Sequence, residues 1–238
     1  MLPRTRSVTV ESFEDLSPHM RRFVLTGPDL ADFPPAMESA HVKVMVPSPA
    51  DAKPSLLSKL AIRKQMRSYT IRFFDRVSKR LTIDFAINDH RGRAADWAKE
   101  AKVGDELTIA GPGSVKHPDF NAPWHLFAAD LTALPALAAT LERLPRDAQG
   151  HVVVQIPDEA DKQELALPTA MTLEWLIAPT HIANGLLDRV KALPWLRGEP
   201  AMFVACESAE VVAIRNYLRT QPMFNAKKLY ASGYWTAE

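Results

Sequence analysis

The sequence has little of what several classes of protein require. Its 238 residues include one cysteine, Cys206, which excludes an intrachain disulfide and a multi-cysteine zinc or iron–sulfur site. No run approaches the roughly 18 apolar residues of a membrane span, and the amino terminus lacks the apolar core of a signal peptide. The seven histidines show no H-x-x-x-H or H-E-x-x-H spacing, so no metal site is predicted. We expect a cytoplasmic protein with no membrane span.

Neither sign of charge predominates in the whole sequence, because the formal net charge is only +1. It is unevenly spread, however. Residues 1–117 carry 19 basic against 14 acidic side chains, and residues 118–238 carry 10 against 14. A basic first half suits an anionic ligand, and the alternative is a solvated basic surface. We expect no nucleic-acid binding, because the basic residues come without an aromatic-interleaved stripe or a known motif.

The pattern of apolar stretches changes along the chain and predicts two domains, 1–119 and 120–238. Six short strands separated by turn residues indicate a closed antiparallel barrel. They are expected at 8–10, 21–25, 41–46, 67–74, 80–87 and 106–110, with one helix at 94–101. Strands then alternate with helices, which indicates a mostly parallel sheet covered on both faces. These strands are expected at 125–129, 152–156, 172–177, 201–205 and 228–231, and the helices at 134–144, 184–192 and 209–220.

Residues 67–72 (RSYTIR) have the composition of a cofactor surface rather than of a core strand. Alternation along a strand places Arg67 and Tyr69 on one face, and Ser68 and Thr70 on the other. A tyrosine ring can lie against an isoalloxazine, a guanidinium can bind a pyrophosphate, and a threonine can reach a flavin nitrogen or carbonyl. The segment therefore predicts one wall of a flavin site.

A second polar segment, residues 88–97 (NDHRGRAADW), ends a strand and begins a helix. A helix amino terminus presents free N–H groups and positive dipole, and small residues let a phosphate approach them. Because Arg67 lies some twenty residues earlier, we expect a pyrophosphate between Arg67 and this helix. The alternative is an ordinary strand-to-helix turn that is capped by Asn88 or Asp89.

Two later segments lie where strands meet helices. In residues 130–136 (DLTALPA), Thr132 is a good amino-terminal cap and Pro135 fits a first turn. The alternative reading is functional, because the carboxyl end of such a strand is where a dinucleotide or flavin edge lies. There is no G-x-G-x-x-G, so a nicotinamide site is not of the fingerprint type. After the strand at 201–205, Ser208 is the expected cap, and Cys206 has no paired base that would make it reactive.

Together these segments resemble the siderophore-interacting proteins, flavin-dependent ferric-siderophore reductases of the ferredoxin-reductase-like superfamily. The resemblance is carried in order by residues 20–30, 67–72, Gly92-x-Ala94-x-x-Trp97, Gly104-Asp105, Gly111-Pro112, 130–136 and 232–235. The most specific parts are Thr-Ala-Leu-Pro-Ala at 132–136 and Gly-Tyr-Trp at 233–235. The family's Gly-Pro-Ala-Ser turn is replaced here by residues 92–95 (GRAA), where Arg93 is expected to take over the phosphate contact of the serine.

The resemblance implies a six-stranded antiparallel FAD-binding barrel followed by a parallel-sheet, NAD(P)H-binding-like domain. It also implies reduction of a ferric siderophore to release Fe(II), with electrons from NADH, NADPH or ferredoxin passing through FAD. The alternatives are a generic NAD(P)H-dependent flavin or ferredoxin reductase, and a flavoprotein that only binds ferric siderophore.

The site residues follow from the same resemblance. The flavin itself transfers the electrons, so no catalytic side chain is implied. Residues expected to hold FAD are Arg67, Ser68, Tyr69, Thr70, Ala86, Ile87, His90, Gly92, Arg93, Ala94, Ala95, Trp97, Thr132 and Trp235. A basic platform for the anionic ferric complex is expected at Arg63, Lys64, Lys227 and Lys228. The protein is expected to act as a monomer.

Overall fold

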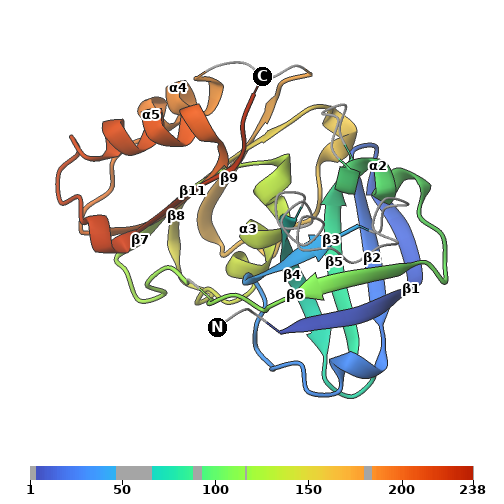
Figure 1. Cartoon of the computed structure of the whole chain (residues 1–238). Coiled ribbons are helices and arrows are strands. Elements are labelled where there is room, and N and C mark those ends of the chain that lie inside the picture. The colour runs from blue at the N-terminus through green and yellow to red at the C-terminus, as the bar shows by residue number, and fades with distance from the viewer. Residues whose placement is uncertain (1–3, 47–65, 88–92, 116, 180–183, 238) are drawn as a thin grey trace, which may run out of the picture. The chain divides into compact units, whose positions relative to one another are not determined.

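The computed structural model describes residues 4–46, 66–87, 93–115, 117–179 and 184–237 (Figure 1). The chain divides into two compact units, Met1–Val115 and Lys116–Glu238. Each unit has its own sheet. Among the described residues, no helix is both long and apolar enough to cross a membrane.

The first unit is a closed six-stranded barrel with strand order β1-β2-β5-β4-β3-β6. Every neighbouring pair is antiparallel, which confirms the predicted barrel. The strands are β1 (Thr5–Ser17), β2 (Met20–Thr26), β3 (His41–Met45), β4 (Arg67–Asp75), β5 (Arg80–Ala86) and β6 (Glu106–Ala110). One 3-10 turn, η1 (Pro28–Leu30), follows β2.

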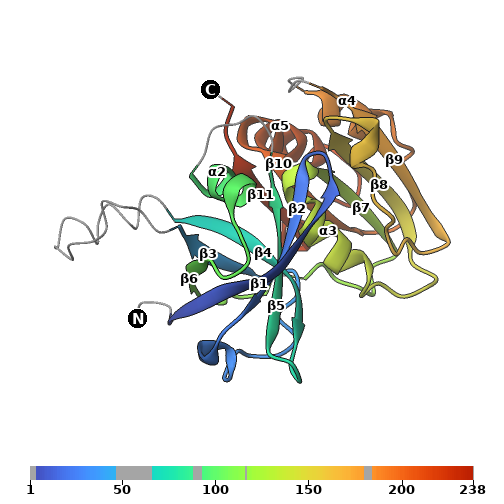
Figure 2. The same ribbon diagram turned by 90° about the vertical axis from the view of Figure 1, so that its right-hand side faces the viewer.

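Strand β1 is much longer than the three residues expected from the sequence. Its first half pairs with β6 and its second half pairs with β2, with register shifts after Val10 and Asp15. The second half is largely exposed and rich in acidic residues, so it lacks the apolar alternation that marks a strand in a sequence. The long β1–β2 hairpin is seen in Figure 2.

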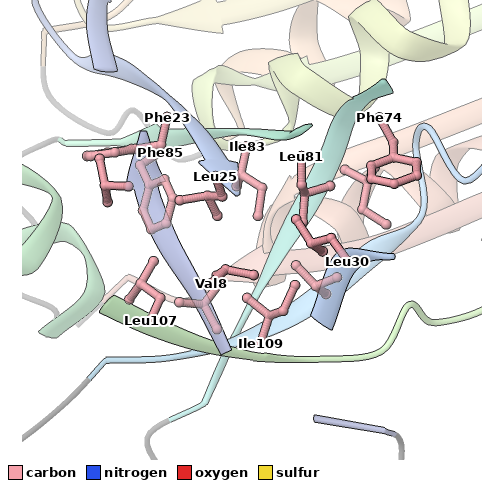
Figure 3. Packing of buried hydrophobic residues seen from close by; sticks show 14 of the residues in the cluster. Val8, Phe23, Leu25, Leu30, Phe74, Leu81, Ile83, Phe85, Leu107 and Ile109 are labelled. Carbon is pink, nitrogen blue, oxygen red and sulfur yellow. The ribbon is translucent and has the colours of Figure 1, made fainter. Parts of the chain in front are cut away.

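Side chains from all six strands fill the barrel interior (Figure 3). Aliphatic residues such as Leu25, Ile83 and Ile109 are fully buried in its middle. Phe23 and Phe85 lie towards one end, called the aromatic end below, where their rings meet edge to face with centroids 5.2 Å apart (Figure 3). Phe74 lies away from them and packs against Phe33 (Figure 3).

Helix α2 (Arg93–Glu100) covers this aromatic end of the barrel (Figure 1). Ala94 and Ala98 are buried and lie four residues apart on one helix face. Between them, the Trp97 ring lies 5.2 Å from the Phe23 ring and 5.7 Å from the Phe85 ring. Trp97 and Ala98 therefore face the barrel interior.

The second unit is a five-stranded parallel sheet with strand order β11-β10-β7-β8-β9. Its strands are β7 (Trp124–Asp130), β8 (Gln149–Ile156), β9 (Ala170–Ile177), β10 (Pro200–Glu207) and β11 (Leu229–Trp235). The helices are α3 (Leu134–Leu141), α4 (Gly185–Ala192) and α5 (Ser208–Leu218), with 3-10 turns η3 (Leu131–Ala133), η4 (Glu159–Asp161) and η5 (Ala226–Lys228). Helices α4 and α5 pack on one face of the sheet and α3 lies on the other (Figure 1). The predicted α/β organisation is confirmed.

Candidate functional site

The first candidate surface is the beginning of strand β4. Arg67 and Ser68 are exposed, Tyr69 is half-buried and Thr70 is buried. Tyr69 pairs with Val42 of β3, whose side chain is fully buried in the barrel. Opposed residues of an antiparallel pair point to the same face, so Tyr69 turns towards the aromatic end of the barrel. Arg67, two residues earlier, lies on the same face.

The Tyr69 ring is already stacked on one side. It stacks on the Phe85 ring, with 4.0 Å between centroids and an angle of 29° between the ring planes. Burial raises the pKa of the Tyr69 phenol far above its ordinary value, and the charge of Arg67 opposes this only weakly. The phenol therefore stays neutral and can donate a hydrogen bond. A flavin can contact only the side of this ring that Phe85 leaves open.

Ser68 and Thr70 project from the other face of β4. The Ser68 hydroxyl accepts a hydrogen bond of 2.6 Å from Lys43 Nζ on β3. Thr70 pairs with His41, which is exposed. The backbone thus separates these two hydroxyls from the face that carries Arg67 and Tyr69.

The other barrel residues expected at the site lie at the end of β5 and on α2. Ala86 and Ile87 are half-buried, and the Ile87 N–H donates to His19 O at 2.9 Å. On α2, Arg93 is exposed, whereas the Ala94 side chain is buried in the barrel core. Ala94 can therefore offer a ligand only its backbone. Ala95 is half-buried.

Four predicted site residues lie outside the described residues. They are Arg63, Lys64, His90 and Gly92.

In the second unit, Asp130 at the end of β7 is the centre of a hydrogen-bond network. Its carboxylate accepts from the Thr132 N–H (2.9 Å), the Thr132 hydroxyl (2.5 Å) and the Trp235 indole N–H (2.6 Å). Burial raises the pKa of the Asp130 carboxyl, and the hydrogen bonds from Thr132 and Trp235 act in the opposite direction. The predicted residues Thr132 and Trp235 are thus brought together by an aspartate that was not itself predicted to be in the site.

The helix caps differ from those expected. Helix α3 has Ala133, not Thr132, at its N-cap, and Asp130 is the N-cap of the preceding turn η3. Glu207, not Ser208, is the N-cap of α5. Glu207 accepts from the N–H groups of Ala209 and Glu210 at 2.6 and 2.9 Å. A carboxylate accepts more than one donor and is favoured by the positive helix end, so it displaces the hydroxyl from this role.

The displaced hydroxyl of Ser208 ties α5 to β11. It donates to the Trp235 carbonyl oxygen at 2.6 Å. The approach requires Gly233, because a Cβ there would lie 2.5 Å from Ser208 Oγ and 3.0 Å from Ser208 Cα. The Gly-Tyr-Trp segment therefore places the tryptophan at the carboxyl edge of the sheet.

Several buried polar groups near this edge were missed by the sequence reasoning. Glu207, Glu210 and Gln155 are each less than 10% exposed, and Gln155 Oε1 finds no hydrogen-bond partner among the described residues. Burial and the nearby carboxylates raise the pKa of the Cys206 thiol well above its usual range. A signal was present for Glu207, as for Asp130, because each ends an otherwise apolar strand.

The two described lysines that are expected in the substrate platform lie at the amino ends of the strands of this sheet, opposite to the carboxyl ends where Asp130 and Trp235 lie. Lys227 and Lys228 are in η5, directly before β11 begins, whereas Trp235 is at the carboxyl end of β11. Seven strand residues, at roughly 3.3 Å each, separate the two ends. Lys228 Nζ also lies 2.8 Å from Glu199 and 3.3 Å from Asp119, and its pKa is raised by them. Its charge is therefore largely compensated within the protein.

The groups at the aromatic end of the barrel fit a flavin nucleotide. A guanidinium and a half-exposed phenol ring share one face of β4. A tryptophan and an exposed arginine lie on the helix that covers the same end. Aromatic faces suit the ring system of a flavin, and arginine suits its pyrophosphate. Residues able to hold FAD are thus present in the first unit.

Two family models cover nearly the whole chain. Residues 9–116 match the model described as "Siderophore-interacting FAD-binding domain", and residues 122–238 match "Siderophore-interacting protein". The chain is 32% identical to ferric vibriobactin reductase ViuB of Vibrio cholerae, over 92% of this chain and 85% of that protein. It is 30% identical to the NADPH-dependent ferric-chelate reductase of Escherichia coli, over 99% and 94% of the two chains.

Solved structures show the same similarity. The siderophore-interacting protein SipS from Aeromonas hydrophila superposes with a TM-score of 0.83 at 36% identity, covering 100% of both chains. The ferredoxin-NADP+ reductase of Plasmodium falciparum shares the fold, with a TM-score of 0.71 at 10% identity over 97% of this chain and 96% of that one. The chain therefore belongs to the siderophore-interacting protein family.

Proposed function

We propose that this protein is a flavin-dependent oxidoreductase that reduces ferric siderophore and so releases Fe(II). One observation carries the proposal: Arg67, Tyr69 and Trp97 gather at one end of a barrel that matches a siderophore-interacting FAD-binding domain. Relatives named as ferric vibriobactin reductase and NADPH-dependent ferric-chelate reductase support the reaction class.

In this proposal the chain's residues hold and orient FAD. Arg67 would bind the pyrophosphate as a bidentate cation. Tyr69 is pre-positioned by its stacking on Phe85, so little side-chain freedom is lost when a ring docks on it. Helix α2 would bring the backbone N–H groups of its first turn, and the Arg93 side chain, towards the phosphates. Ser68 and Thr70 would offer their hydroxyl groups to the cofactor as hydrogen-bonding groups from the other face of β4.

The chemistry that FAD supplies when bound is acceptance of two electrons as hydride from NAD(P)H and their release one at a time, so that one NAD(P)H reduces two Fe(III) to Fe(II). In the second unit, a hydrogen bond to Asp130 holds the indole of Trp235 in place. This hydrogen bond limits the freedom of the Trp235 ring, which the family resemblance makes a candidate contact of the cofactor. We favour NADPH or NADH as electron donor over ferredoxin, because one relative is NADPH-dependent.

The substrate would be steered by positive charge, since ferric siderophores are commonly anionic complexes. Arg63 and Lys64 remain the main candidates for this platform, because Lys227 lies at the end of β11 opposite to Trp235. Lys228 is a weaker candidate because Glu199 and Asp119 already pair with it. The iron is substrate and needs no ligand from the protein.

The test is reconstitution with FAD, followed by anaerobic reduction with NADPH, NADH or reduced ferredoxin in separate titrations. Mixing with ferric siderophore should then reoxidise the flavin, with Fe(II) trapped by a ferrous chelator. Fe(II) formation from free flavin alone at the same rate would contradict an enzyme. Reoxidation without preference for ferric siderophore over other acceptors would instead indicate a general flavin reductase, and binding without reoxidation a carrier.

The residue test is Arg67→Ala. Loss of a charged hydrogen bond to phosphate should weaken FAD binding by roughly 1.5–3 kcal/mol, or about ten- to a hundredfold in Kd. Arg76→Ala is the matched control, because Arg76 is an exposed arginine in the β4–β5 turn at the other end of β4. An unchanged FAD affinity in Arg67→Ala would remove Arg67 from the site. The measurement is quenching of flavin fluorescence on titration with protein.

A further inference from the structure

The side chain of Arg21 on β2 forms hydrogen bonds with the backbone of the last turn of helix α2. Arg21 Nη1 donates to the carbonyl oxygens of Ala98 and Lys99, both at 3.0 Å. The same guanidinium uses Nε and Nη2 to grip the two carboxylate oxygens of Asp15 on β1, at 2.6 and 3.1 Å. It also lies 5.0 Å from the centre of the Phe13 ring. One guanidinium thus joins β1, β2 and α2.

This contact stabilises the carboxyl end of a short helix. Helix α2 has only eight residues, and an isolated helix of that length is not stable in water. Its last carbonyl groups have no partner within the helix and carry the negative end of its dipole. A guanidinium satisfies both needs, because it brings N–H donors and positive charge to that end.

Arg21 is suited to this role by its position in the barrel. It pairs with Phe85 across β2 and β5, and it precedes Phe23 by two residues. It therefore points to the same inner face as these rings, at the end that α2 covers. Only 15% of the side chain is exposed. Asp15 is more open, and its pKa is lowered by the hydrogen bond from Arg21.

A lysine could not reproduce this arrangement. Its single ammonium group is a point charge, whereas the planar guanidinium reaches two carbonyls and a carboxylate at once. The carboxylate fixes the plane of the guanidinium, and the Phe13 ring supports one side of it. The orientation of Arg21, and not only its charge, is thus built into the structure.

We propose that Arg21 is a positioning residue for FAD, which acts by holding α2 in the place where the helix can contact the phosphate end of the cofactor. This inference rests on the proposed function. Arg21 itself would not touch FAD. Without it, α2 would keep the contacts of Trp97 with Phe23 and Phe85 but lose its anchored carboxyl end. The fraction of molecules with a competent helix would fall, and the apparent Kd for FAD would rise by the inverse of that fraction.

The test compares FAD with riboflavin, which carries the same ring system but no phosphate. Kd for each is measured by flavin fluorescence or absorbance in wild type, Arg21→Met, Arg21→Lys and Asp15→Asn. We expect Arg21→Met to weaken FAD binding about tenfold and riboflavin binding much less, with about 1.4 kcal/mol per tenfold change. Arg21→Lys should restore part of the preference for FAD. Asp15→Asn should have a smaller effect in the same direction.

The matched control is Arg80→Met. Arg80 makes a two-pronged pair with Glu11 on the same barrel, and one of its bonds is 2.6 Å long. It lies at the start of β5, whereas the helix-covered end is near Ala86. Its replacement should leave the ratio of FAD to riboflavin affinity unchanged.

Three results would overturn the inference. The first is equal weakening of FAD and riboflavin in Arg21→Met, which would show general loss of barrel structure. The second is wild-type affinity for both flavins in Arg21→Met and Arg21→Lys. The third applies if Arg21→Met does not fold. In that case, Arg21→Lys and Asp15→Asn proteins that fold and keep the wild-type ratio of FAD to riboflavin affinity would overturn the inference. A wild-type protein that binds no FAD would instead overturn the proposed function, and this inference with it.

Discussion

His125 should make the second unit sensitive to mild acid. Its side chain is 1% exposed, and neither ring nitrogen has a hydrogen-bond partner among the described residues. Burial lowers the pKa of His125, and the charge of Asp119 opposes this to a smaller extent. The imidazole is therefore neutral in the folded protein at pH values where it is protonated in the unfolded chain. We predict that His125→Phe removes part of the acid sensitivity.

The sign and size follow from proton linkage. Below an unfolded pKa of about 6.5, the unfolded chain binds a proton that folded His125 does not, so the free energy of unfolding falls as pH falls. The loss continues until the folded pKa is reached, with a slope of up to about 1.4 kcal/mol per pH unit. At pH 8 no proton is involved, and removal of two unpaired buried nitrogens should stabilise the variant by about 1 kcal/mol. The advantage of His125→Phe should then grow by about 1 kcal/mol at pH 5.5.

Urea unfolding at pH 8 and pH 5.5, followed by tryptophan fluorescence, measures this difference. Four of the five tryptophans belong to the second unit, so the signal reports mainly on the sheet that contains His125. His151, whose pKa burial also lowers, is present in both proteins and cancels. Phe127→Leu is the control, because it alters the neighbouring core position without a titrating group. A stability difference between His125→Phe and wild type that is the same at both pH values would refute the reasoning.

Two further predictions concern buried groups of the second unit. Glu210→Ala should lower the free energy of unfolding by about 1–3 kcal/mol, because Glu210 Oε1 accepts from the N–H groups of Leu186 and Leu187 at 2.7 and 3.3 Å. Urea midpoints test this against exposed Glu164→Ala, and equal midpoints would contradict it. Cys206 should react with a thiol reagent only after unfolding, because burial and neighbouring carboxylates disfavour its thiolate. Rapid modification of the native protein, followed by absorbance, would be the contrary result.

The positions of most strands along the chain, and the type of each sheet, could be predicted because each strand reports its own environment. In the barrel, half-buried strands alternate, and in the second unit a strand such as β10 is a continuous apolar run buried on both faces. Strand β1 was underestimated because its second half, from Glu11 to Ser17, is polar and bends to meet β2. Pairing with a distant partner, not local composition, makes that half a strand.

The wall of the candidate site on β4 could also be predicted, because alternation alone places Arg67 and Tyr69 on one face. The stacking of Tyr69 on Phe85 could not, since it depends on the β4–β5 pairing and on a register shift between Ile71 and Phe73. The role of Arg21 in holding α2 joins residues 77 and 78 positions apart. No local pattern in a sequence reports a contact of that kind.

The missing glycine fingerprint and the presence of Asp130 have one physical explanation. Glycines at the first turn of a dinucleotide-binding unit leave bare N–H groups for a phosphate. Here the same turn follows β7, and the Asp130 carboxylate already accepts from the Thr132 N–H and hydroxyl. A phosphate at this position would compete with a buried carboxylate of like charge. The turn instead uses its donors to fix Asp130, which in turn holds the Trp235 indole. Under the proposed function, a nicotinamide donor would have to be recognised by other groups, so Thr132 and Trp235 carry the family resemblance without specifying a coenzyme.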